Sequence, residues 1–123
     1  MTDRKSEEMA KLAYRALEEK KAEDIKLISI EKISVIADYF LIASGANRNQ
    51  VLALADSVEE ALTKAGYALK QSEGYHSASW ILQDYGDVIV HIFDRENRLF
   101  YDIERIWRDG DMISVEELDK EKA

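Results

Sequence analysis

Cysteine is absent from this chain of 123 residues, which excludes disulfide bonds and thiolate metal sites. No apolar run approaches the roughly 18 residues that a membrane-spanning helix needs. The polar start of the chain, from Met1 to Lys5, does not resemble a secretory signal. These absences predict a cytoplasmic protein. A chain of this length is expected to form one domain that buries its core without a metal or a disulfide.

Positive charge is also scarce. The chain carries 17 Lys and Arg residues against 25 Asp and Glu residues, for a net charge of -8. Proteins that hold nucleic acid by its phosphates do so with Lys and Arg, so this balance argues against that kind of binding. An acidic surface suits a basic protein partner better. The alternative is that the charge only keeps the protein soluble.

Sequence motifs for catalysis are equally scarce. Gly45 stands alone, so the chain has no glycine-rich phosphate loop. The two histidines, His76 and His91, do not have the spacing of metal ligands. A triad of His91, Asp84 and a nearby serine would lack the strained turn that exposes a catalytic serine. We therefore predict no catalytic residue, no metal site and no cofactor.

The spacing of apolar residues predicts the order helix, two strands, helix, three strands, helix. The predicted segments are 2–22, 25–30, 38–44, 48–65, 68–72, 79–84, 87–93 and 97–107. Asn47 and Gly66 are the expected caps of the second helix. The mostly charged stretch 108–123 is expected to be loosely held. This order predicts an α/β fold, a single domain with a mixed sheet of about five strands and flanking helices.

A β-hairpin is predicted where Tyr85 and Gly86 connect two strands. With these two residues as the loop, Asp84 pairs with Asp87, and the side chains divide into a mixed face and an aliphatic face. The mixed face carries Trp80, Leu82, Ile89, His91 and Phe93, and the aliphatic face carries Ile81, Gln83, Val88, Val90 and Ile92. We expect the aliphatic face to pack on the helices. The mixed face has the composition of an interface.

Short motifs extend on both sides of this hairpin. They are Ala37 to Phe40, Ser44-Gly45, Glu73-Gly74, Trp80, Asp84 to Asp87, Val90 to Phe93, Arg98, Phe100-Tyr101 and Glu104 to Trp107. Their order and spacing over residues 8–110 resemble the signature of the ribosomal silencing factor (Iojap-like) family. One departure is Ala46-Asn47 after the glycine, where the family usually has Ser or Thr.

The resemblance implies a fold similar to that of nucleotidyltransferases without their activity. It implies binding to the large ribosomal subunit through its fourteenth protein, which blocks association with the small subunit and represses translation under nutrient limitation. No enzymatic activity and no direct grip on nucleic acid are expected, and some family members form homodimers. The implied silencing domain is 1–110, followed by an acidic tail at 111–123.

The mixed face and the family motif together predict the partner-binding site. Its expected centre is Trp80, Leu82, His91 and Phe93, and its expected rim is Glu73, Asp84, Arg98 and Tyr101. Two alternatives belong to other classes of function. One is a metal-dependent nucleotidyltransferase that uses Asp38, Asp84 and Asp87. The other is direct binding of ribosomal RNA, which would weaken steeply with salt.

Overall fold

The elements of the chain follow the predicted order as far as residue 96. The computed structural model describes residues 4–30, 37–96 and 111–113. Its elements are α1 (Arg4–Glu19), β1 (Glu23–Ser29), β2 (Tyr39–Gly45), α2 (Arg48–Lys64), β3 (Gln71–Glu73), β4 (Trp80–Asp84), β5 (Val88–Asp94) and β6 (Asp111–Ile113). Their ends differ from the predicted ones by a few residues. The helix predicted at 97–107 lies outside the described residues.

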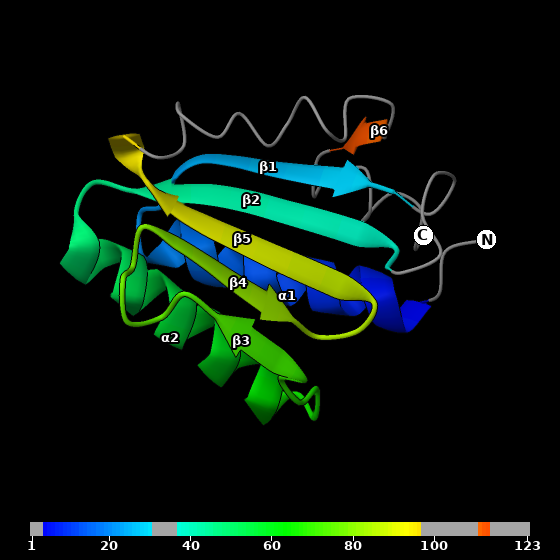
Figure 1. Ribbon diagram of the computed structural model, residues 1–123. Coiled ribbons are helices and arrows are strands. Elements are labelled where there is room, and N and C mark those ends of the chain that lie inside the picture. The colour runs from blue at the N-terminus through cyan, green and yellow to red at the C-terminus, as the bar shows by residue number, and fades with distance from the viewer. Residues whose placement is uncertain (1–3, 31–36, 97–110, 114–123) are drawn as a thin grey trace.

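The strands form one sheet in the order β3-β4-β5-β2-β1-β6 (Figure 1). Strands β2 and β5 are parallel, and the other neighbours are antiparallel. A single α/β domain with a mixed sheet is therefore confirmed. The sixth strand comes from the stretch that was expected to be loosely held, and that expectation was wrong for residues 111–113. The division of the chain at residue 110 stays a prediction.

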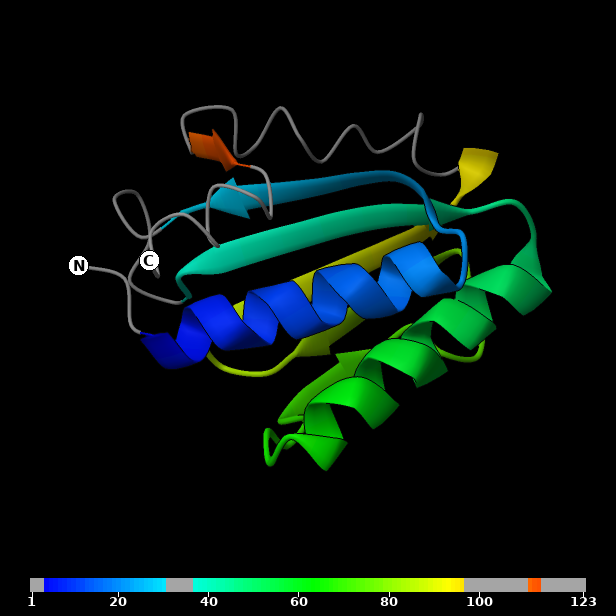
Figure 2. The same ribbon diagram turned by 180° about the vertical axis from the view of Figure 1, so that it is seen from behind.

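Helices α1 and α2 both lie on one face of the sheet (Figure 2). Each turns an apolar stripe toward it, as amphipathic helices do. The buried residues of the stripes are Met9, Ala10, Ala13, Ala16 and Leu17 in α1 and Val51, Leu54, Ala55, Val58 and Leu62 in α2. They form one core with the inward side chains of the central strands, including Leu41, Val88, Val90 and Ile92. The prediction that the aliphatic hairpin face packs on the helices is confirmed.

The ends of α2 are capped as predicted. The Oδ1 atom of Asn47 accepts a hydrogen bond of 2.9 Å from the backbone N–H of Gln50, which satisfies a free donor of the first turn. At the other end, Gly66 has a φ of 93°. The N–H of Tyr67 bonds to the carbonyl of Leu62, and the N–H of Gly66 bonds to that of Thr63. This pair of bonds is the Schellman motif, which ends helices at a glycine.

The predicted register of the hairpin was wrong, because the two-residue loop lies one position further along the chain than predicted. Asp84 pairs with Ile89 instead of Asp87, and Leu82 pairs with His91. The turn closes between Tyr85 and Val88, where the N–H of Tyr85 donates to the carbonyl of Val88 at 3.0 Å. Gly86 is thus the first loop residue, where its φ of 94° suits a hairpin turn. The pairing moves by two residues in total, so every side chain keeps its predicted face.

Candidate functional site

The sheet surface turned away from α1 and α2 is here called the outer face. Cross-strand partners point to the same side of a sheet. The pairs Trp80–Phe93, Leu82–His91 and Glu73–Leu82 therefore bring the predicted centre and one rim residue together. No helix of the described residues covers this face, which is turned to the viewer in Figure 1.

An aromatic cluster occupies the middle of the outer face. The rings of Trp80 and Phe93 stack with centroids 5.2 Å apart, and those of Trp80 and His91 lie 5.9 Å apart. Phe40, on the neighbouring strand β2, adds a fourth ring 4.7 Å from that of His91. The sequence prediction missed Phe40 as a member of this group. Its place follows from the parallel pairing of β2 with β5, which connects segments far apart in the chain.

The members of the predicted centre differ in exposure. Phe93 is 0% exposed and His91 is 3% exposed, whereas Trp80 and Leu82 are half-buried. Both half-buried side chains belong to β4, and both buried ones belong to β5. Trp80 and Leu82 therefore remain partly accessible, whereas their cross-strand neighbours His91 and Phe93 are buried.

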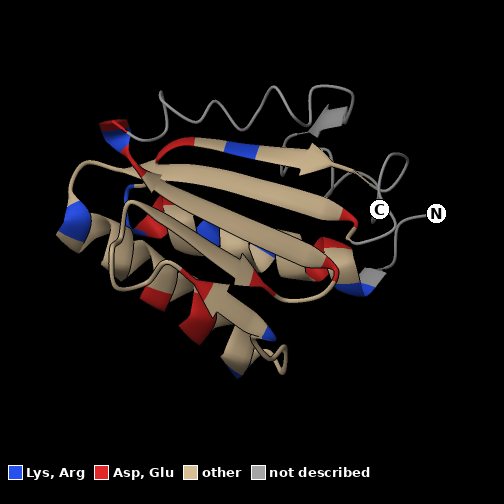
Figure 3. Cartoon of the chain, viewed as in Figure 1, with Lys and Arg blue, Asp and Glu red and all other residues tan. Residues whose placement is uncertain are grey.

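Acidic residues lie at the edge of this apolar centre. Glu73 is exposed on the edge strand β3, and its Oε1 accepts a 2.9 Å hydrogen bond from Gln71. Asp84 is half-buried at the end of β4, and its Oδ1 accepts a 2.8 Å bond from the N–H of Gly86. The middle parts of β2, β4 and β5 carry no charge (Figure 3). The other two predicted rim residues, Arg98 and Tyr101, lie outside the described residues.

His91 is held as a neutral imidazole. Its Nδ1 accepts a 3.0 Å hydrogen bond from the indole N–H of Trp80. Burial lowers the pKa of His91 from 6.5 to about 4, because the charged form loses its hydration. The bond to Trp80 also occupies the nitrogen that a catalytic triad would turn toward Asp84. The triad considered from the sequence is therefore not formed.

The three aspartates of the nucleotidyltransferase alternative lie at one end of the sheet, where the N–H of Asp38 bonds to the carbonyl of Asp87 at 2.8 Å, but they are not grouped as metal ligands. The side chain of Asp38 accepts a 2.8 Å hydrogen bond from the hydroxyl of Ser6 on α1, while Asp84 caps the hairpin turn. Within residues 4–30, 37–96 and 111–113, no three His, Cys, Asp or Glu side chains are grouped to hold a metal ion. No helix of these residues is long and apolar enough to cross a membrane.

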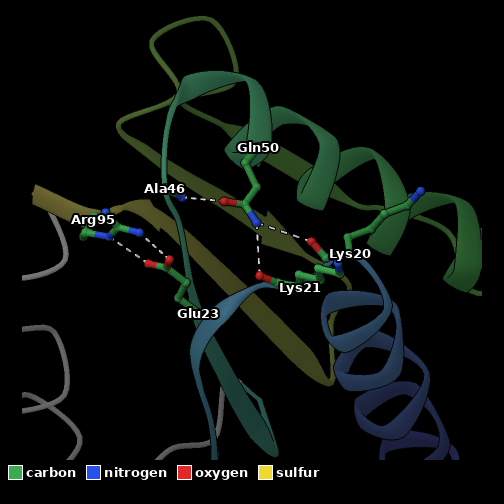
Figure 4. A network of polar contacts seen from close by, with 6 residues as sticks. All are labelled: Lys20, Lys21, Glu23, Ala46, Gln50 and Arg95. Carbon is green, nitrogen blue, oxygen red and sulfur yellow. Dashed lines mark hydrogen bonds and ion pairs between the residues drawn. The ribbon is translucent and has the colours of Figure 1, made fainter.

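The side chain of Gln50 occupies the turn after β2. The Oε1 atom of Gln50 accepts a 2.6 Å hydrogen bond from the N–H of Ala46. The Nε2 atom of Gln50 donates to the carbonyls of Lys20 at 3.3 Å and Lys21 at 3.0 Å (Figure 4). One side chain thus ties the start of α2 to the end of α1. It also pairs with the N–H of Ala46, which is the backbone donor that would face a phosphate at a glycine turn of this kind.

An ion pair lies close to this turn. The Nε of Arg95 donates to Oε1 of Glu23 at 2.9 Å, and a second guanidinium nitrogen pairs with Oε2 (Figure 4). The hydrogen bonds to Arg95 lower the pKa of the Glu23 carboxyl. Arg95 and Glu23 thus form a surface salt bridge. It joins the end of β5 to the start of β1.

Comparison with known proteins identifies the family. A family model described as "Ribosomal silencing factor during starvation" matches residues 3–123. The chain belongs to the ribosomal silencing factor family. The curated ribosomal silencing factor RsfS of Halalkalibacterium halodurans is 38% identical over 111 residues, which span 90% of this chain and 95% of that protein. The protein of the same name from Bacillus subtilis is 39% identical over 86% of this chain and 90% of its own length.

Solved structures agree with this family assignment. A crystal structure from Chromobacterium violaceum has 40% identity and a TM-score of 0.80, covering 87% of this chain and 88% of that one. A second, from Bacillus halodurans, has 36% identity and a TM-score of 0.78, covering 87% of this chain and 97% of that one. Plant proteins named Iojap are more distant, with 29% identity for the chloroplastic protein of Arabidopsis thaliana over 89% of this chain and 43% of its own length. The predicted family resemblance is confirmed.

Proposed function

We propose that this chain binds the large ribosomal subunit through the fourteenth protein of that subunit. Bound there, it blocks the approach of the small subunit and so represses translation when nutrients are short. The action needs affinity and bulk but no chemistry, so we propose a cytoplasmic binding protein that is not an enzyme. The family membership supports the silencing role.

The observation that carries the docking proposal is the pair of half-buried apolar side chains on the outer face. Trp80 and Leu82 are neighbours on β4, and Trp80 rests on the buried ring of Phe93. Tryptophan is among the residue types that most often dominate the binding energy of protein interfaces, and such residues lie in well-packed surroundings. A standard interface buries roughly 800 Å² per partner, which a sheet face and its surrounding edge can provide.

Charge supports a basic protein as the partner. The net charge of -8 opposes binding to bare phosphate groups, and the acidic Glu73 stands beside the apolar pair, across from Leu82. Lys and Arg side chains of a ribosomal protein would find opposite charge at this edge. Complementary charge of this kind speeds the encounter and excludes wrong partners more than it adds affinity.

The first test is comigration with purified large subunits in a sedimentation gradient. We expect wild-type protein to comigrate, and we expect Trp80→Ala to weaken binding by roughly 30-fold or more, the usual cost of about 2 kcal/mol for a central interface tryptophan. The matched control is Tyr75→Ala, because Tyr75 is an exposed aromatic side chain whose hydroxyl bonds to Asp56 on α2. Undiminished binding by folded Trp80→Ala protein would remove Trp80 from the site.

A second pair of variants tests the charge argument. Glu73→Lys and Glu60→Lys make the same change of charge, the first beside Trp80 and Leu82 and the second on the exposed side of α2, where Glu60 pairs with Lys64. We expect only Glu73→Lys to weaken binding. Equal effects of the two variants would show that only the net charge matters.

Direct binding of ribosomal RNA is the competing account of the same affinity. It predicts that binding weakens steeply as the salt concentration rises, because each phosphate contact releases a counterion. Docking on a protein predicts a shallow dependence on salt. A steep slope together with unchanged binding of Glu73→Lys would favour RNA.

A further inference from the structure

The indole of Trp80 has its only hydrogen-bond donor directed inward. The Nε1–H group donates to Nδ1 of His91 at 3.0 Å. An indole has no other donor and no strong acceptor. The part of Trp80 that remains accessible is therefore apolar ring, although tryptophans at interfaces commonly offer the N–H to a partner.

This bond fixes the protonation of His91. An imidazole nitrogen accepts a hydrogen bond only when it carries no proton, so the proton of the neutral ring is on Nε2. The Nε2 atom is buried and has no hydrogen-bond partner among the residues that the structure describes. An unpaired buried donor costs stability. A phenylalanine at this position would fill similar space without that cost, so the gain from histidine lies in the acceptor that it offers to Trp80.

Stacking holds the indole in a second direction. The ring of Trp80 lies on that of Phe93 at 5.2 Å, with 23° between the two planes. The hydrogen bond to His91 limits rotation within that plane. Two directional contacts thus restrain a side chain that is only half-buried, and a restrained side chain loses less conformational freedom when it binds.

We infer that His91 is a positioning residue that takes up the indole N–H of Trp80 and presents the ring to the partner as an apolar, electron-rich surface. This inference rests on the proposed function, and it specifies the chemistry of the contact. A ring with no donor to offer suits the aliphatic stem and the cationic head of an Arg or Lys side chain, which bind to the faces of aromatic rings. Glu73, across from the neighbouring Leu82, supplies the opposite charge.

The first arm of the test is nuclear magnetic resonance of the free protein. In wild-type protein, we expect slow hydrogen exchange of the Trp80 indole N–H and an imidazole of His91 with its proton on Nε2. The indole signals of Trp80 and Trp107 are distinguished with a Trp107→Phe variant. Fast exchange at Trp80, or a proton on Nδ1 of His91, would overturn the inference without any binding experiment.

The second arm compares two variants of His91 in binding to large subunits. His91→Phe keeps a ring and removes the acceptor, and we expect binding to weaken by about tenfold, in the range usual for coupled neighbours. His91→Asn puts an amide oxygen at the position of Nδ1, and we expect it to restore both slow indole exchange and most of the binding. Thermal unfolding of each variant shows that it is folded.

The outcomes separate this inference from the proposed function. If folded His91→Phe binds as tightly as the wild type, the positioning role is wrong even though docking stands. If wild-type protein fails to bind large subunits, the proposed function is wrong. In either case, the hydrogen-exchange rate of the indole N–H shows whether the hydrogen bond between Trp80 and His91 is present.

Discussion

The buried imidazole of His91 predicts a loss of stability in mild acid. Its pKa is lowered from 6.5 to about 4 by burial, while the unfolded chain keeps the ordinary value. The unfolded state therefore binds a proton between these values that the folded state does not. A group with a lowered pKa in the folded state stabilises the fold above the unfolded pKa, and this contribution is lost as the pH falls from 6.5 toward 4.

The expected size follows from the two pKa values. The interval from 6.5 to about 4, at about 1.4 kcal/mol for each pH unit, amounts to about 3 kcal/mol. This is a large share of the roughly 5–15 kcal/mol by which small domains are stable. Protonation would also place an N–H on Nδ1, facing the indole N–H of Trp80, so the bond between the two rings would be lost.

Urea unfolding at a series of pH values from 7 to 4 measures this effect. Carboxylates titrate in the same interval, so the relevant quantity is the difference between wild-type protein and His91→Phe. We expect the free energy of unfolding to fall by about 3 kcal/mol more in the wild type. His76→Phe is the matched control, because it makes the same replacement at the other histidine of the chain, which is exposed. Parallel curves for wild type and His91→Phe would show that burial of His91 does not make the stability depend on pH.

Three further predictions concern the fold that supports the outer face. Asn47→Ala removes the cap that accepts from Gln50 and should lower the free energy of unfolding by about 1 kcal/mol in urea denaturation; no change would contradict the capping role. Gly86→Ala forces a side chain into a φ of 94° and should lower the melting temperature by several degrees, for a cost of about 1–2 kcal/mol; an unchanged melting temperature would contradict the turn. Gln83→Ala removes the amide that donates to the carbonyl of Ala55 at 3.0 Å and accepts from the buried hydroxyl of Tyr85 at 3.2 Å and should cost about 1–3 kcal/mol by calorimetry, because the hydroxyl loses its acceptor; an unchanged stability would contradict the role of these two bonds.

The sequence was sufficient to predict the elements of residues 4–96 and the division of the hairpin into two faces. Alternating patterns report which side of a sheet a residue takes, and Trp80, Leu82, His91 and Phe93 all lie on the predicted side. The same patterns do not report register, because a shift of two residues leaves the alternation unchanged. The positive φ of Gly86 decides the turn, and periodicity contains no information on it.

Contacts between distant segments were beyond prediction. Phe40 joins the aromatic cluster through the parallel pairing of β2 with β5, and the three residues of β6 become a strand because β1 offers them a partner. The exposure of a side chain also depends on contacts between distant segments. The sequence grouped His91 with Trp80 as equal members of a docking surface, whereas packing buries the first and leaves the second half-buried. Such differences arise from the assembled sheet and have no local signal.

We propose that the outer face of the sheet holds the large subunit and keeps the small subunit away. The most direct test of this proposal is the yield of joined ribosomes when purified subunits are mixed with wild-type protein or with folded Trp80→Ala. We expect wild-type protein to lower the yield and Trp80→Ala to leave it close to the yield without added protein. Equal inhibition by the two proteins, or an unchanged yield with both, would contradict it.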